Sequence, residues 1–469
     1  MGILRRAAQA VGYPVWTWSV TRGLARDGFD PQMGTVDPRK ALDFVASLPD
    51  PGVFVMADVH ASFGDPAVVR RIKEIAQQSK PGQTLVLTGP RTQIPPELEG
   101  LAIPWTLEPP TSEELEGLVR RTIDGLAARG VPVALDTQGI GELVDAIKGL
   151  TLPEAEYLVL EAAFRDGRLD EADVAEVRSM KAALLEANGV LELMATDVGG
   201  LDRVGGMERL KAWLRVRGRA FEPAASSFGL EPPRGVLLTG VPGCGKSLVA
   251  KAIARSWELP LVLLDPGRLY GAYVGESEGR LEAALRTVKA MAPVVLWVDE
   301  IEKGFAAGVS AGDSGVSQRV LGTFLRWMQE RPAGVFIVAT CNDVAALPAE
   351  LLRRGRFDEI FFVDLPCARD RAEILRMHLE RRKRDPAAFD LAKLAEASAG
   401  YSGAELEGAV VGALYRAYAE GRDVSTETVL EEIQATTPLS RTRAEDVAHL
   451  RAWSVGRATP AADGEPAAT

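Results

Sequence analysis

A glycine-rich loop between a predicted strand and a predicted helix is the feature that most constrains the fold of this chain. The stretch GVLLTGVPGCGKSLVAKAIA contains Gly240, four intervening residues, and then Gly245, Lys246 and Ser247. An apolar strand leads into the loop and a helix leads out of it. Glycines let backbone N–H groups surround a phosphate, and the helix N-terminus favours negative charge there. The stretch therefore predicts an α/β domain that binds the phosphates of a nucleotide.

The loop and the start of its helix supply most of the predicted nucleotide contacts. Lys246 can neutralise the β- and γ-phosphates, and Ser247 can be a ligand of Mg²⁺. A chance glycine-rich turn is the alternative, and the flanking strand and helix disfavour it. The predicted nucleotide-binding residues here are Gly240, Val241, Pro242, Gly243, Cys244, Gly245, Lys246, Ser247 and Leu248.

Two later strand ends carry side chains suited to phosphoryl transfer. The apolar run VVLWVDE ends in Asp299 and Glu300, and VFIVATCN places Asn342 at the end of another run. Ligands of parallel sheets bind at the carboxyl ends of the strands, so we expect these side chains near the phosphate loop. Asp299 would hold Mg²⁺ through water, Glu300 would polarise the attacking water, and the Asn342 amide would orient it. An acid pair that only caps a helix is the alternative.

The stretch LLRRGRFD adds two arginines, Arg353 and Arg356, to the predicted catalytic set. A guanidinium group can stabilise the charge on a transferring phosphoryl group and can raise the rate by about 10³- to 10⁵-fold. Taken alone, arginines in a loop are usually surface charges. With Lys246, Glu300 and Asn342, they complete the set of predicted catalytic residues.

Composition limits the class of protein. The chain has 469 residues, of which 46% are apolar and 25% charged, as in ordinary globular proteins of two or three domains. The net charge of −11 argues against a dedicated nucleic-acid binder. The three cysteines, Cys244, Cys341 and Cys367, show no CxxC spacing, which is typical of a reducing compartment. With no apolar run of membrane-spanning length, we expect a soluble cytoplasmic protein without a membrane partner.

The order of these motifs resembles the AAA family of ATPases. The resemblance covers about residues 197–433, and finer stretches such as VVLWVDEIEKGF are similar to AAA proteins encoded in algal chloroplast genomes, cyanobacteria and other bacteria. It implies binding of ATP and Mg²⁺ and hydrolysis of ATP. The opening DVGGL would place Asp197 and Gly199 near adenine, and GYSGAEL would place Gly403 and Ala404 of a helical lid near ribose and adenine.

The same resemblance implies a homo-oligomer, usually a hexameric ring, because the arginines matching Arg353 and Arg356 reach the neighbouring subunit's site in the family. YVGESE resembles the family's first pore loop, with Tyr273, Val274 and Gly275 facing the ring axis; the alternative is that Tyr273 packs within its own domain. Two stretches depart from the family pattern. WMQE replaces the usual Asp-Gly pair, and the segment 308–319 lacks the charges of a second pore loop.

The N-terminal part predicts a second sheet. Runs such as VFVMADV, TLVLTGP and IPWTL alternate with helical patterns, and Asp37-Pro38 predicts a capped helix start. The order of Asp58, Thr88, a PPEL element and a proline after IPWTL parallels the later unit, although unrelated α/β domains remain the alternative. No GK[ST] precedes Asp58, and Val59 stands where the later unit has Glu300. We therefore predict a degenerate module that does not hydrolyse ATP.

The expected fold is α/β, with two tandem AAA-type modules, each a parallel sheet covered by helices on both faces and followed by a helical lid. The predicted domains are a degenerate module at 12–195 with a helical segment at 112–193, an ATPase core at 196–365, a lid at 366–435, and a tail at 436–469 whose end, RATPAADGEPAAT, is disordered.

The expected function is ATP hydrolysis that drives remodelling or partial unfolding of a protein partner whose identity the sequence does not give. Two alternatives stay open. One is an ATP-gated regulatory scaffold that threads nothing, and the other is a nucleic-acid motor, which the acidic composition disfavours.

Overall fold

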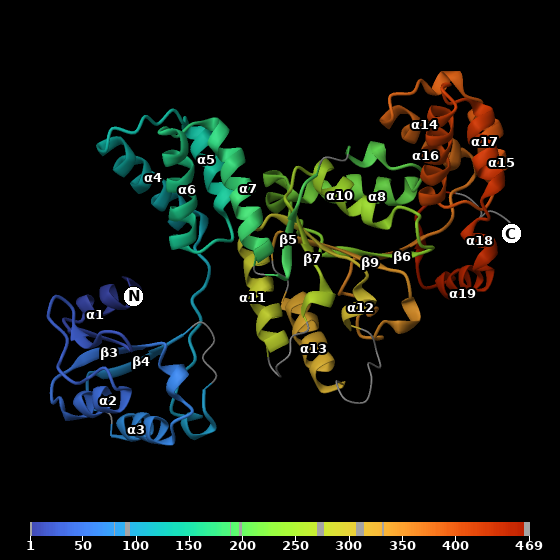
Figure 1. Cartoon of the computed structure of the whole chain (residues 1–469). Helices are drawn as coiled ribbons and strands as arrows, with labels where there is room; N and C mark the ends of the chain where they lie inside the picture. Colours follow the sequence, from blue (N-terminus) through green and yellow to red (C-terminus); the bar gives the residue numbers. More distant parts are fainter. Residues whose placement is uncertain are drawn as a thin grey trace. The chain divides into compact units, whose positions relative to one another are not determined.

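The chain forms two compact units, Met1–Leu107 and Glu108–Thr469, in the computed structural model shown in Figure 1. The structure describes residues 2–78, 80–89, 94–187, 189–196, 199–269, 276–305, 314–330 and 333–463. In this part of the chain, no helix combines the length and the apolar character that crossing a membrane requires.

The N-terminal unit is a four-stranded sheet with helices packed on it. The strand order is β2-β1-β3-β4; β1, β3 and β4 are parallel, and β2 is antiparallel to β1. Asp37 caps α2 by accepting a hydrogen bond from the Arg39 backbone N–H, with Pro38 at the first helical position, as predicted. The elements are α1 (Gly2–Ala10), β1 (Val15–Ser19), β2 (Gly23–Arg26), α2 (Pro38–Ser47), β3 (Gly52–Ala57), α3 (Pro66–Gln77) and β4 (Gln83–Thr88).

One predicted strand of this unit is wrong. The run IPWTL forms no strand, and its side chains are exposed, Ile103 by 94% and Trp105 by 65%. Alternation of apolar residues indicates a strand only if a neighbouring strand accepts its hydrogen bonds, and β4 has only β3 as a partner among the described residues.

The larger unit contains a seven-stranded sheet in the order β11-β10-β6-β9-β8-β7-β5. Neighbouring strands from β11 to β7 are parallel, and β5 at the edge is antiparallel to β7. All five strands predicted for the later unit are present. The strands are β5 (Leu191–Met194), β6 (Gly235–Gly240), β7 (Leu261–Leu264), β8 (Val294–Val298), β9 (Val335–Cys341), β10 (Glu359–Val363) and β11 (Thr459–Pro460).

Helices cover both faces of this sheet, with α8 and α10 on one side and α11, α12 and α13 on the other (Figure 1). Two apolar cores result, because every residue of β6, β8 and β9 is buried. Continuous burial is typical of the central strands of a parallel sheet. The helices are α8 (Glu208–Gly218), α9 (Pro223–Ser227), α10 (Lys246–Ser256), α11 (Glu276–Ala290), α12 (Ile301–Phe305) and α13 (Ser314–Glu330).

A four-helix segment precedes the sheet and belongs to the same unit. It has its own apolar core, α7 packs against β5, and Gly149 lies so close to the core domain that a Cβ there would be 2.4 Å from Met291 Cγ. The expected boundary near residue 195 is therefore wrong: the division falls after Leu107, and β5 joins the large sheet. The helices are α4 (Ser112–Ala128), α5 (Thr137–Ile147), α6 (Leu152–Asp166) and α7 (Glu171–Ala187).

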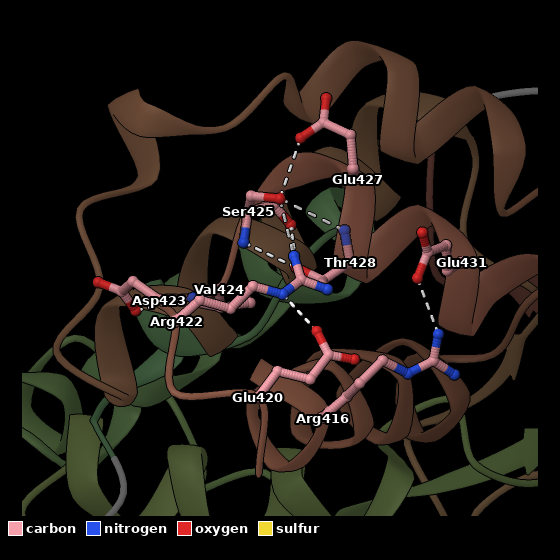
Figure 2. Close-up of polar contacts among 9 residues, drawn as sticks. All are labelled: Arg416, Glu420, Arg422, Asp423, Val424, Ser425, Glu427, Thr428 and Glu431. Carbon is pink, nitrogen blue, oxygen red and sulfur yellow. Dashed lines mark hydrogen bonds and ion pairs between the residues drawn. The ribbon is translucent and has the colours of Figure 1, made fainter. Parts of the chain in front are cut away.

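A helical lid follows β10. The Ser402 hydroxyl and the Glu405 carboxylate form a capping box at the start of α16. Figure 2 shows the turn between α16 and α17, where Ser425 caps α17 and Arg416 of α16 pairs with Glu431 of α17. The lid helices are α14 (Ala368–Arg381), α15 (Leu391–Ala397), α16 (Gly403–Ala419) and α17 (Thr426–Ala435).

The segment after the lid is folded as far as residue 463, which corrects the expected disorder of its end. Helices α18 (Leu439–Thr442) and α19 (Ala444–Ser454) lead to β11, which pairs with β10. Ala461 is 2% exposed and packs in the core beside α8. Composition did not reveal this, because a short strand can be held by the edge of an existing sheet even without large apolar side chains. Residues 464–469 lie outside the described part.

An ion pair fastens this segment to the sheet. Arg451 Nε donates to both oxygens of Asp364, at 3.1 and 2.9 Å, and each side chain is 19% exposed. Arg451→Met leaves a half-buried carboxylate without this partner, so we expect a loss of about 1.5–3 kcal/mol in the free energy of unfolding, measured by urea titration. Arg443→Met removes an exposed pair with Asp446 and should cost less than about 1 kcal/mol. Equal losses in the two variants would contradict this role.

Candidate active site

The phosphate loop joins β6 to α10, as the sequence predicts. Gly243 and Gly245 adopt left-handed backbone conformations, with φ of 75° and 89°. A Cβ on Gly240 would lie 2.1 Å from the carbonyl oxygen of Val363, so only glycine fits between β6 and β10 at this point. The loop is thus shaped by backbone requirements, and the first turn of α10 directs unpaired N–H groups into the space above it.

Lys246 lies under this loop. Its side-chain Nζ donates to the carbonyl oxygens of Gly240, at 2.8 Å, and Val241, at 2.9 Å, and the residue is 6% exposed. Burial lowers the pKa of Lys246 below its ordinary value. Gly240 and Val241 thus contact the Lys246 ammonium through their carbonyl oxygens. Neither residue lines the cavity of the site.

Asp299, at the end of β8, is held by two hydroxyl groups. Its Oδ1 accepts hydrogen bonds from Ser247 Oγ at 3.1 Å and from Thr340 Oγ1 at 2.5 Å. Hard oxygen ligands of this kind suit Mg²⁺, which usually binds one or two protein oxygens and completes its shell with water and phosphate oxygens. Ser247 and Asp299 therefore fit the predicted Mg²⁺ site. Thr340 was missed in the sequence; only its place at the end of β9 could have indicated it.

Glu300 is fixed next to this group. It has a left-handed backbone with φ of 47°, and its N–H donates to Thr340 Oγ1 at 2.9 Å. Asn342 Nδ2 donates to Glu300 Oε1 at 3.1 Å, and Lys303 Nζ pairs with Oε2. The ion pair raises the pKa of the Lys303 ammonium. The structure thus brings the predicted Glu300 and Asn342 together and adds Lys303, which the sequence did not single out.

A second carboxylate, Glu302, supports the end of β9. It is 8% exposed, and its Oε1 accepts a hydrogen bond from the Asn342 backbone N–H at 3.0 Å. Burial raises the pKa of the neighbouring Cys341 thiol, with Glu302 as a further cause. A buried acid that fixes the Asn342 backbone fixes the orientation of its amide as well.

A cavity of 920 Å³ connects these groups to the lid. The Ala404 backbone N–H donates to the Gly243 carbonyl oxygen at 2.9 Å, so the start of α16 rests on the phosphate loop. Burial raises the pKa of the Cys244 thiol in the loop to about 12, so this cysteine is no nucleophile. The lining includes the predicted Gly199, Pro242, Gly243, Cys244, Gly245, Lys246, Ser247, Leu248, Asp299, Glu300, Asn342, Gly403 and Ala404.

The far end of the cavity has a lining that the sequence did not predict. Val204, Met207, Ile374 and Met377 supply apolar surface, which suits a nucleobase. Polar side chains of α14 and α16 complete this end of the cavity. The signal in the sequence was weak, because these residues come from two segments that are far apart in the chain.

Several predicted site residues do not lie at this cavity. Arg353 is exposed, and Arg356 donates to the Leu325 carbonyl oxygen and lines a separate cavity of 240 Å³. Neither arginine lines the nucleotide cavity of its own chain. Asp197 and the predicted pore-loop residues Tyr273, Val274 and Gly275 lie outside the described residues.

Comparisons with protein families agree with this geometry. The model described as "ATPase family associated with various cellular activities (AAA)" matches residues 236–365, and an AAA+ lid domain matches 388–432. SpoVK-like AAA ATPase models match residues 1–105, as an N-terminal domain, and 113–188, as a second domain. The boundary between these two matches agrees with the division of the structure after Leu107.

Relatives extend the match over nearly the whole chain. An uncharacterized AAA domain-containing protein, ycf46, of Trieres chinensis is 33% identical, covering 96% of this chain and 91% of the relative. The chain belongs to the AAA family of ATPases. A ycf46 protein of Pyropia yezoensis is 32% identical, with 94% and 89% covered. The AAA core is also similar to the proteasome-activating nucleotidase of Aeropyrum pernix, 36% identical over 42% of this chain and 49% of the relative.

The parallel α/β core and the helical lid are thus an AAA domain and an AAA+ lid domain. Membership of the AAA family implies that the chain binds and hydrolyses ATP, typically with Mg²⁺. The sequence-based assignment to this family, including its plastid-encoded relatives, is confirmed.

Proposed function

We propose that the protein hydrolyses ATP with Mg²⁺ and uses the cycle to remodel a protein partner. The observation that carries the hydrolytic part is the single cavity in which the phosphate loop, the Asp299–Ser247–Thr340 group and the Glu300–Asn342 pair meet beneath the lid. Each of these groups has a distinct chemical task in phosphoryl transfer.

The proposed mechanism assigns these tasks by geometry. Lys246 turns its ammonium from the Gly240 and Val241 carbonyl groups toward the β- and γ-phosphates. Ser247 and Asp299 would hold Mg²⁺, which neutralises charge on the phosphates. Glu300 takes a proton from the attacking water, and Asn342 holds both the Glu300 carboxylate and that water. Lys303 must release the Glu300 carboxylate before the carboxylate can act as a base.

We also propose that the active form is a ring in which neighbours complete each other's sites. The support is that Arg353 and Arg356 lie away from the nucleotide cavity of their own chain, although the sequence assigns them to catalysis. Arg356 donates to a backbone carbonyl group beside a cavity of 240 Å³, on a surface that a second copy could cover.

Mixing subunits tests the shared site. Arg356→Ala chains added to wild-type chains should lower phosphate release by more than their share of the mixture, because each variant also disables a wild-type neighbour. Arg369 lies at the start of α14 and lines neither cavity, so it provides the control. Mixing in Arg369→Ala chains should lower phosphate release by no more than dilution of the wild-type chains does. A monomer with full turnover would refute the ring.

A trapped ATP-bound state tests whether the protein acts on a protein partner. Glu300→Gln chains loaded with ATP should hold a partner long enough for isolation, and the ADP-loaded variant is the control. Replacement of Tyr273 by Ala, from the predicted pore loop, should abolish remodelling while ATP turnover continues. If the Tyr273→Ala protein keeps full function in cells, threading is refuted.

A specific observation favours a second candidate, an ATP-gated scaffold. Trp327 stands where the family has an Asp-Gly pair, and its ring stacks on Phe324 with centroids 6.0 Å apart, partly buried against the core. A side chain used in packing is poorly suited to relay the state of a nucleotide between subunits. Such a scaffold would assemble with ATP and leave its partner folded, which the same Tyr273→Ala experiment distinguishes.

We further propose that the N-terminal unit is a degenerate relative of the ATPase core. In support, β2-β1-β3-β4 parallels β5-β7-β8-β9: an antiparallel edge strand followed by three parallel strands. Asp58 after β3 has a left-handed backbone, φ 53°, as Glu300 has with φ 47°. The Asp58 N–H donates to the backbone carbonyl oxygen of Thr88, whereas the Glu300 N–H donates to the side-chain hydroxyl of Thr340.

This likeness shifts the alignment made from the sequence by one residue. β3 pairs Ala57 with Thr88, whereas β8 pairs Val298 with Ala339 and so brings Asp299 opposite Thr340. With the two threonines matched, Asp58 corresponds to Glu300 rather than to Asp299, and Ala57 takes the place of the Mg²⁺-holding acid. The proposed unit would then lack the metal-holding carboxylate as well as the phosphate loop.

A further inference from the structure

Glu407 brings into the nucleotide cavity a carboxylate that the hydrolytic mechanism does not use. It lies on α16, three residues after Ala404, whose N–H donates to the phosphate loop. Three residues of α-helix advance about 4.5 Å, so Glu407 stands one turn beyond the phosphate loop, toward the apolar end of the cavity. In a bound nucleotide, the sugar lies between the phosphates and the base, at this depth.

The carboxylate is fixed from one side. Arg382 Nη2 donates to Glu407 Oε1 at 2.8 Å, and His378 Nδ1 lies 3.7 Å from the same oxygen. The hydrogen bond from Arg382 holds the pKa of Glu407 below its ordinary value, so the group is an ionised acceptor at neutral pH. Within the described chain, its second oxygen, Oε2, accepts no hydrogen bond. Glu407 is thus oriented, charged and open to a donor in the cavity.

A purely structural role is the competing explanation, since the Arg382–Glu407 pair also links α14 to α16. That role needs only the paired oxygen. It does not account for a side chain that lines the cavity with 41% of its surface exposed while Arg382 is 21% exposed. A partly desolvated carboxylate with a free oxygen suits neighbouring hydroxyl groups, as do the acidic residues that bind ribose in dinucleotide-binding folds.

We propose that Glu407 accepts a hydrogen bond from the ribose 2′-hydroxyl group and thereby selects ribonucleotides over deoxyribonucleotides. This inference rests on the proposed binding of ATP in the cavity. Loss of one hydrogen bond to a charged group weakens binding by about 10-fold or more, so the full chain should bind 2′-deoxy-ATP at least about 10-fold more weakly than ATP. Arg382 and His378 act as positioning residues that hold the carboxylate for this contact.

Equilibrium binding of ATP and 2′-deoxy-ATP to the full chain tests the contact. Glu407→Ala should weaken the binding of ATP but scarcely change the binding of 2′-deoxy-ATP, so the ratio of the two Kd values should fall to about one. The ratio is informative even if the variant loosens the lid, because a general loss affects both nucleotides equally. Glu396→Ala, an exposed lid acid outside the cavity, should keep the wild-type ratio.

Three results would overturn the assignment of Glu407. The wild type could bind the two nucleotides equally, or Glu407→Ala could keep the wild-type ratio. Finally, Glu407→Ala could change only the preference for ATP over inosine triphosphate and not the preference for ATP over 2′-deoxy-ATP, which would place the contact on the base. By contrast, a wild type that binds no nucleotide would refute the proposed function itself, so the two failures are distinguishable.

Discussion

The Glu300→Gln variant should bind ATP as the wild type does and release phosphate about 10²- to 10⁴-fold more slowly, the range by which general-base catalysis speeds reactions. Glutamine keeps an oxygen that can accept the hydrogen bond from Asn342 Nδ2, so the site retains its shape while losing the base. The readout is steady-state phosphate release together with equilibrium binding of ATP.

A matched control separates the base from general charge effects. Glu282→Gln removes an exposed acid of α11 away from the cavity and should leave turnover unchanged. If Glu300→Gln turned over ATP at the wild-type rate, Glu300 would not be the base. Loss of ATP binding in the same variant would instead mean that the carboxylate holds the site together.

Lys246→Ala should weaken ATP binding by about 10²-fold or more. Each hydrogen bond from a charged group to a phosphate contributes about 1.5–3 kcal/mol, and the ammonium can serve two phosphates. Binding is measured by equilibrium titration with ATP.

Lys251 on the same helix provides the control for this substitution. Its ammonium lies 5.7 Å from the centre of the Trp297 ring, and the residue does not line the cavity. Lys251→Ala should therefore leave ATP affinity within about twofold, since a cation–π contact contributes only about 0.5–2 kcal/mol to stability and nothing to the phosphates. Comparable losses in both variants would indicate damage to α10 rather than loss of the phosphate contact.

Local sequence determined the parts of the site that lie on consecutive residues. The phosphate loop needs glycines at backbone positions that other residues adopt poorly, and those glycines are visible in the sequence. The five strands of the core were predictable because strands buried on both faces are continuous apolar runs. Asp299, Glu300 and Asn342 could be placed near the loop because parallel strands end at one edge.

The strands at sheet edges and the boundary between the two units could not be predicted in the same way. IPWTL has the composition of a strand but pairs with no strand among the described residues, whereas β11 has little apolar character and is held by β10. The helical segment α4–α7 has a helical pattern that is compatible with a lid, and only its packing against β5 and Met291 shows that it belongs to the larger unit. Hydrogen-bond partners at a sheet edge are a property of tertiary structure.

The family, the phosphate loop and the principal acids could be identified from residue types alone, because their chemistry depends on those residues standing at fixed short spacings. The contacts of these residues came from the fold instead. Thr340 lies between Asp299 and Glu300, and Lys303 pairs with the Glu300 carboxylate. Arg382 donates to Glu407, which lines the cavity. Hydrogen bonds and ion pairs need distances of about 3 Å between atoms, and only folding brings atoms of distant segments that close together.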